Sequence, residues 1–146
     1  MTLSCSHESS VNLKEVNILL VEDNPINQKF VILSLQKLVK SIDVAHNGQE
    51  ALERFNPLRH HIILMDIQMP VMDGIKATQK IREIESEKQT PPTHIIAITA
   101  NTLSCDRERC LSAGMNDYIG KPFSASVLIQ KMKNLLAGGS SIHPVP

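Results

Sequence analysis

Five side chains that could take part in chemistry come within two residues of the ends of short apolar segments of the sequence. Glu22 and Asp23 follow one such run and Asp66 another, while Thr99 and Lys121 follow two more. Three carboxylates brought close together would repel one another strongly unless a cation lay among them. Carboxylate oxygens are the ligands that Mg²⁺ prefers, so this pattern favours a site for Mg²⁺ or Mn²⁺.

A hydroxyl and an ammonium beside such a cation would suit phosphoryl transfer. These sites work mainly by positioning the phosphoryl group and neutralising its charge. Lys121 would balance the phosphoryl oxygens, Thr99 would donate a hydrogen bond, and a carboxylate such as that of Asp66 can be the nucleophile. The first run is followed by EDNPIN rather than a glycine-rich phosphate loop, so nucleotide binding is not expected.

The apolar runs are typical of strands buried on both faces of a parallel sheet. They are rich in Ile, Val and Leu and lack strict alternation with polar residues. They span residues 16–21, 42–45, 62–65, 95–98 and 118–119. Ligands of such sheets usually bind at the carboxyl ends of the strands. If the first and third strands are neighbours, their ends bring the three acids together, so we expect the site at this edge of the sheet.

Helical patterns separate these strands. Leu128, Met132 and Leu135 form one apolar stripe within residues 124–137. Other helices are expected from Pro25 towards Val39, after the Asn47–Gly48 turn, after Asp73 as N-cap, and at residues 103–111. Five strands alternating with five helices predict an α/β domain with a parallel sheet and right-handed crossovers.

Length and composition narrow the function further. The 146 residues suit one domain, expected at 15–137 between flexible tails at 1–14 and 138–146. Fifteen basic and fifteen acidic residues argue against direct nucleic-acid binding. A signal peptide and a long apolar span are both lacking, and three cysteines fit a reducing compartment, so we expect a soluble, cytoplasmic protein.

Four linked motifs resemble the receiver domain family of response regulators. They are VEDNPINQK at 21–29, LMDIQMPVMDG at 64–74, ITAN at 98–101 and YIGKPF at 118–123. The first is most similar to the C-terminal receivers of hybrid sensor histidine kinases. The resemblance implies a flavodoxin-like (βα)5 fold with strand order 2-1-3-4-5.

The resemblance also implies a role for each site residue. Asp66 would accept the phosphoryl group and, with Asp23, bind the metal directly. Gln68 would supply a backbone carbonyl to the metal, and Glu22 would act through water. Thr99 and Lys121 would contact the phosphoryl group.

Further positions match residues that, in the family, form the conformational switch or set the lifetime of the phosphoryl group. Thr99 and Tyr118 would form the conformational switch, and the bond before Pro122 would be cis. Gln68 and Asn101 would flank the path of attacking water, so changing both is expected to alter the half-life of the phosphoryl group.

The function implied is that of a phosphorelay receiver. A phosphohistidine on a histidine kinase or a histidine phosphotransfer protein would donate to Asp66, and the new charge would shift Thr99 and Tyr118. The helix of Ile26 and the loop around Pro122 would contact the donor. The chain would catalyse its own phosphorylation and dephosphorylation, alone or as part of a membrane-anchored hybrid kinase whose kinase core lies outside this sequence.

Three alternative functions predict other sequence features than those present. A pseudo-receiver that only binds a partner would lack a site residue, and none is missing. A Mg²⁺-dependent phosphatase with an aspartyl intermediate would need a second acid where Gln68 stands. A flavin-binding domain would need phosphate-binding loops and aromatic residues, but the chain has one Tyr and no Trp.

Overall fold

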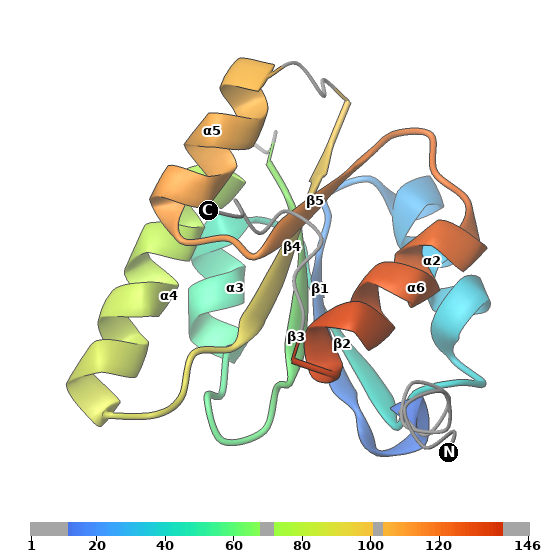
Figure 1. Ribbon diagram of the computed structural model, residues 1–146, viewed down its shortest axis with the longest axis horizontal. Helices are drawn as coiled ribbons and strands as arrows, with labels where there is room; N and C mark the ends of the chain where they lie inside the picture. Colours follow the sequence, from blue (N-terminus) through green and yellow to red (C-terminus); the bar gives the residue numbers. More distant parts are fainter. Residues whose placement is uncertain (1–11, 68–71, 101–103, 139–146) are drawn as a thin grey trace, which may run out of the picture.

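The computed structural model describes residues 12–67, 72–100 and 104–138, and in this part of the chain five strands form one parallel sheet (Figure 1). The strand order is β2-β1-β3-β4-β5. The strands are β1 Asn17–Val21, β2 Ser41–Ala45, β3 Ile62–Asp66, β4 His94–Thr99 and β5 Asp117–Gly120. The predicted α/β fold and the order implied by the resemblance are both confirmed.

In the described part of the chain, five α-helices cover the two faces of the sheet. They are α2 Pro25–Leu35, α3 Gly48–Arg54, α4 Gly74–Lys88, α5 Ser104–Ala113 and α6 Ala125–Leu136, after a short 3-10 helix at Leu13–Glu15. Figure 1 shows α2 and α6 on one face and α3, α4 and α5 on the other. This two-sided cover explains why the strands are apolar on both faces.

Side-chain caps set where the helices begin. Asn24, Asn47, Asp73 and Ser124 each accept a hydrogen bond from a backbone N–H in the first turn of the helix that follows. The far end of α2 differs from the expectation, because the helix ends at Leu35 and not near Val39. Beyond it the chain turns back towards the sheet, and Lys40 donates its backbone N–H to the carbonyl of Val16.

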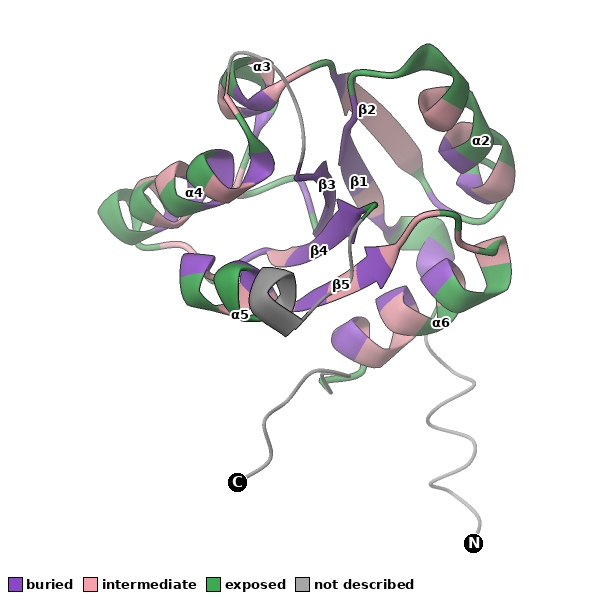
Figure 2. Cartoon of the chain, turned by 90° about the horizontal axis from the view of Figure 1, so that it is seen from above, coloured by how far each residue is buried: buried purple, intermediate pink, exposed green. Residues whose placement is uncertain are grey.

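The core consists of two apolar clusters, one on each side of the sheet. Ile18, Leu20 and Leu64 belong to the cluster under α2 and α6, whereas the neighbouring Leu19 and Ile63 belong to the other. Figure 2 shows the central strands as buried between the helices. Leu13 is also buried, although it was placed in the N-terminal tail, because it packs in the first cluster.

Arg82 joins α4 to the segments that lead into β4 and β5. Its guanidinium donates to Glu85, to the carbonyls of Thr93 and Gly114, and to the side chain of Asn116. These bonds use the planar, five-donor geometry that lysine lacks. They hold the amino ends of the two strands whose carboxyl ends carry Thr99 and Lys121.

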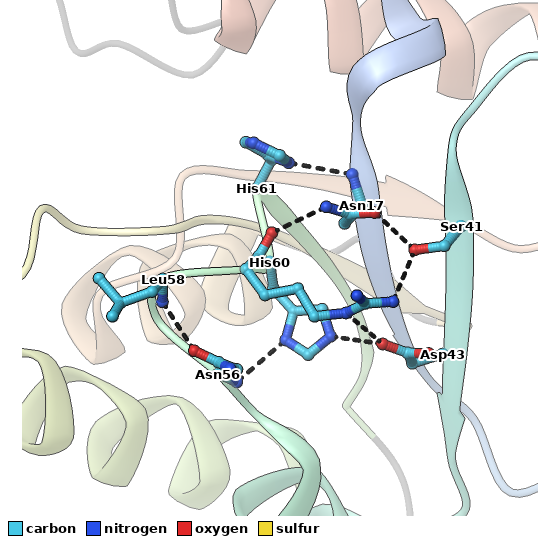
Figure 3. A network of polar contacts seen from close by, with 8 residues as sticks. Asn17, Ser41, Asp43, Asn56, Leu58, His60 and His61 are labelled. Carbon is cyan, nitrogen blue, oxygen red and sulfur yellow. Dashed lines mark hydrogen bonds and ion pairs between the residues drawn. The ribbon is translucent and has the colours of Figure 1, made fainter.

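A polar network links the amino ends of β1, β2 and β3 (Figure 3). The buried His60 accepts a backbone N–H from Asn56 at Nδ1 (3.0 Å), so its proton lies on Nε2, 2.8 Å from Asp43. Arg59 also donates to Asp43, and His61 accepts the backbone N–H of Asn17. Burial lowers the pKa of His60 despite the hydrogen bond to Asp43, so the network holds the neutral imidazole.

Two histidines predict a pH-dependent share of the stability. Burial lowers the pKa of both His60 and His94 from the ordinary 6.5, so near and below that pH each of them binds more protons in the unfolded chain than in the folded one. The stability that these two residues contribute should therefore fall as the pH drops from about 7.5 to about 5.5. Urea unfolding followed by circular dichroism, on the unchanged protein and on variants of each histidine, separates this share from that of carboxyl groups with a raised pKa such as Glu22.

Two variants separate the contribution of each histidine. Gln in His60→Gln can accept and donate hydrogen bonds without titrating, so the free energy of unfolding of the unchanged protein relative to this variant should fall over the same pH range, and His94→Gln should show the other share. A difference between the unchanged protein and His60→Gln that stays constant with pH would contradict the assignment.

Candidate functional site

Three carboxylates meet at the carboxyl ends of β1 and β3. Glu22 and Asp66 are buried, with exposed fractions of 1% and 2%, whereas Asp23 is exposed. Among the described residues, one carboxylate oxygen from each of the three lies within 4.8 Å of the others. The cause is the parallel pairing of Val21 with Met65, which makes the ends of β1 and β3 neighbours.

Lys121 brings a positive charge to this group. Its Nζ lies 3.4 Å from Asp66 Oδ2 and 3.5 Å from Glu22 Oε1. The Lys121 backbone N–H donates to the carbonyl of Thr99 (2.8 Å), which joins the end of β4 to the turn after β5. The peptide bond from Lys121 to Pro122 is cis. One ammonium among three carboxylates leaves the site with an excess of negative charge.

Burial and the excess negative charge both affect the pKa of Glu22. Burial, followed by the charge of Asp66 and a hydrogen bond with it, raises the pKa of Glu22 to about 7, and the opposing effect of Lys121 is weaker. Ionising both buried carboxylates is therefore costly without a further cation. Oxygen donors on three side chains, with Asp23 at the solvent side, fit a hard divalent ion such as Mg²⁺ or Mn²⁺.

Thr99 ends the strand next to that of Asp66, and Tyr118 lies on β5, one strand further along the sheet. Thr99 is the buried last residue of β4, and Asp66 pairs with Ile98, the residue before it. Tyr118 is half-buried on β5, packs against the cluster under α3, α4 and α5, and has Lys131 Nζ 5.7 Å from its ring centroid. Gln68 and Asn101 lie outside the described residues.

The chain that follows Asp66 passes close to the start of α4. Gly74 donates its backbone N–H to the carbonyl of Ile67 (3.0 Å). A Cβ at Gly74 would clash with the backbone carbonyl oxygen of Asp66, so only glycine fits at this approach. Asp73 therefore caps α4, as expected, and Gly74 packs against the backbone of the candidate phosphoacceptor.

Asn27 and Gln28 contact Glu22, a role that the sequence analysis did not assign. Asn24 donates its backbone N–H to Glu22 Oε2 (3.2 Å), and the Asn27 side chain lies 3.4 Å from the same oxygen. Gln28 Nε2 donates to the Glu22 backbone carbonyl at 2.7 Å. The sequence feature that could have indicated this contact is the place of the two residues, which lie in the first turn of the helix that follows the acidic pair.

A largely apolar cleft adjoins the carboxylates. It has a volume of about 520 Å³ and lies between α2 and the turn after β5. Phe30 and Phe123 meet across it edge to face, with ring centroids 5.5 Å apart. Three exposed apolar side chains follow along α2: Ile26, Phe30 and Leu33, with exposed fractions of 78%, 43% and 61%. We call these three the apolar stripe of α2.

Comparison with known proteins identifies the family. The sequence profile of the response regulator receiver domain matches residues 18–133. The chain belongs to this family. It is 45% identical over 128 residues to hybrid signal transduction histidine kinase B of Dictyostelium discoideum, a match that covers 82% of this chain but 6% of that kinase. This receiver domain thus spans a small part of that relative.

Two solved structures are similar to this receiver domain. The receiver domain of Saccharomyces cerevisiae Ssk1, solved with the histidine phosphotransfer protein Ypd1, is 36% identical with a TM-score of 0.78, covering 84% of this chain and 89% of that one. The receiver domain of a sensor histidine kinase from Pseudomonas aeruginosa, solved with magnesium in its active site cleft, is 43% identical with a TM-score of 0.68, covering 86% and 99%. This chain is thus a receiver domain of the two-component phosphorelay type.

None of the helices in the described part of this receiver domain has the length and apolarity needed to cross a membrane.

The crowding of carboxylates predicts that Asp66→Asn stabilises the protein when divalent ions are removed. A pH of about 8 lies above the raised pKa of Glu22, and removing the charge of Asp66 relieves the repulsion that Glu22 feels there, which we expect to raise the free energy of unfolding by about 0.5–2 kcal/mol. With Mg²⁺ the unchanged protein should gain more stability than the variant, because ion binding favours the folded state.

Urea unfolding in EDTA and in Mg²⁺ measures both effects. Asp73→Asn is the matched control, because it removes the same charge from a helix cap while the Asn side chain can still cap. A variant Asp66→Asn that is less stable than the unchanged protein in EDTA would contradict this account.

Proposed function

We propose that this receiver domain accepts a phosphoryl group on Asp66 from a phosphohistidine, in a reaction that depends on Mg²⁺ or Mn²⁺. The observation that carries the proposal is the arrangement around Asp66, a buried carboxylate with Lys121 Nζ at 3.4 Å and two further acids that each bring an oxygen within 4.8 Å. Few other chemical tasks need a lysine and three converging carboxylates.

The chain's own residues can perform each part of the transfer. A carboxylate oxygen of Asp66 attacks phosphorus, the bond between phosphorus and the imidazole nitrogen breaks, and the leaving imidazole keeps the electron pair. Lys121 balances the charge of the incoming phosphoryl oxygens, and the hydroxyl of Thr99 donates a hydrogen bond to one of them. The product is an acyl phosphate on Asp66 and a free histidine on the donor.

Asp23, Asp66 and the backbone carbonyl of Gln68 would hold the cation, with Glu22 acting through water. When bound, the ion supplies positive charge to the phosphoryl oxygens. Gln68 and Asn101 would then orient or block the water that hydrolyses the acyl phosphate.

The phosphoryl group would act as a conformational switch. Its charge would draw the Thr99 hydroxyl inward, and Tyr118 would follow into the space that Thr99 leaves. Tyr118 also lines a cleft of about 340 Å³, together with Val127, Lys131 and others. This cleft would change shape as the Tyr118 ring moves.

The partner would be a histidine kinase or a histidine phosphotransfer protein that docks on the apolar stripe of α2 and the turn around Pro122. This surface borders the cleft that reaches Glu22 and Lys121, so a donor histidine resting on it would face Asp66. The equal numbers of acidic and basic residues favour such a protein partner over a nucleic acid. We place the reaction in the cytoplasm, either on this chain alone or as part of a membrane-anchored hybrid kinase.

Phosphorylation by a small donor tests the central claim. With acetyl phosphate and Mg²⁺, the intact mass of the protein should increase by one phosphoryl group, and the increase should be absent in Asp66→Asn and in EDTA. Asp73→Asn, the matched control, should still be phosphorylated. If neither acetyl phosphate nor a phosphorylated transfer protein gives an adduct, the domain is a binding module that is not phosphorylated.

Docking on the apolar stripe is tested by Ile26→Ala. Loss of this contact should reduce kcat/KM for transfer from phosphorylated Ypd1 about tenfold, the effect of about 1.4 kcal/mol at an interface. Transfer from acetyl phosphate, which needs no docking surface, should be unchanged.

Leu58→Ala provides the matched control, because Leu58 is also exposed (85%) but lies outside this surface, in the segment before β3. Equal loss in both variants, or loss with acetyl phosphate as well, would count against docking on α2.

A further inference from the structure

We propose that Gln28, together with Asn27, is a positioning residue for the divalent cation: the first turn of α2 holds Glu22, and through it the acidic pair, in the geometry that the ion needs. The inference rests on the proposed function insofar as that function requires a cation at Glu22, Asp23 and Asp66. It assigns a task to two residues that themselves need not touch the ion.

The backbone of Glu22 lies where the sheet ends. Its N–H still donates to the carbonyl of Ala45 in β2 (3.0 Å), continuing the sheet by one bond. Its carbonyl accepts instead from the Gln28 side chain, whose Nε2 lies 2.7 Å away. The direction of the chain from Glu22 into Asp23 is therefore set by a side chain of α2.

The two carboxylate oxygens of Glu22 have different partners. Oε2 accepts from the backbone N–H of Asn24 and from Asn27 Nδ2, both at the start of α2. Oε1 is the oxygen that lies 3.5 Å from Lys121 Nζ. One oxygen is thus anchored to the helix while the other faces the charged site.

Anchoring matters here because the acids repel one another. Without a cation, the charge of Asp66 repels that of Glu22. If the turn after β1 were not restrained, it would move the Glu22 carboxylate away from Asp66. Donors that hold the carbonyl and the carboxylate keep the oxygens converged, so less reorganisation is needed when the ion arrives. Groups that orient metal ligands in this way affect the ion's affinity strongly.

Gln28 could instead have only a structural task, the satisfaction of a buried carbonyl at the end of β1. Such a task would alter the free energy of unfolding but would not alter cation affinity in the folded protein. Measurement of Mg²⁺ binding separates the two.

The test compares two matched substitutions on one helix. Gln28→Met removes the amide donor and nearly keeps the side-chain length, whereas Gln36→Met makes the same change at the exposed C-cap of α2. Isothermal titration with Mg²⁺ alone, on the full chain at a temperature where each variant is folded, gives the dissociation constant. Urea unfolding in EDTA gives the stability of each variant.

We expect the Mg²⁺ dissociation constant of Gln28→Met to rise about three- to tenfold, and that of Asn27→Ala about two- to fivefold, with Gln36→Met unchanged. Asn27→Ala also carries the test if Gln28→Met fails to fold, because it removes only one 3.4 Å hydrogen bond from a half-buried side chain.

Folded Gln28→Met and Asn27→Ala that bind Mg²⁺ as tightly as the unchanged protein would overturn the positioning role and leave the proposed function intact. Weakening as large in Gln36→Met would also overturn it. An unchanged protein that binds no Mg²⁺ would overturn the proposed function together with this inference.

Discussion

The repulsion among three carboxylates at one edge of the sheet is the constraint around which the rest of this structure is arranged. Glu22 and Asp66 are almost fully buried, and the ammonium of Lys121 lies close to both. Burial and the charge of Asp66 together raise the pKa of Glu22 to about 7, so a charged Glu22 beside Asp66 is unfavourable here. A fold selected only for stability would not keep such a group together.

What holds the acids in place is the rigid framework behind them. Central strands β1 and β3 carry the acids, and their side chains are buried in apolar clusters on both faces, so neither strand end can move away freely. Arg82 holds the amino ends of β4 and β5, and at their carboxyl ends Thr99 accepts the backbone N–H of Lys121. Such preorganisation is what a site acting by electrostatics needs, because the charges must not rearrange at the moment of reaction.

Helix α2 shows how one element serves several purposes. Val31 and Leu35 pack in the core, the first turn contacts Glu22, and Ile26, Phe30 and Leu33 remain exposed. The sequence predicted a helix starting at Pro25, and the start was right. It could not predict which apolar side chains of this helix are covered, because this depends on where α6 and the turn after β5 lie.

The sequence by itself determined the fold class, the starts of the helices and the acids at the strand ends. These follow from apolar runs, capping residues and motif spacing, all of which act over a few neighbouring residues. Only the tertiary structure decided that Gln28 holds the carbonyl of Glu22, that the pKa of Glu22 is raised, and that His60 is buried against Asp43. Contacts of this kind depend on strand order, register and depth of burial, which are properties of the packed sheet and not of any local segment.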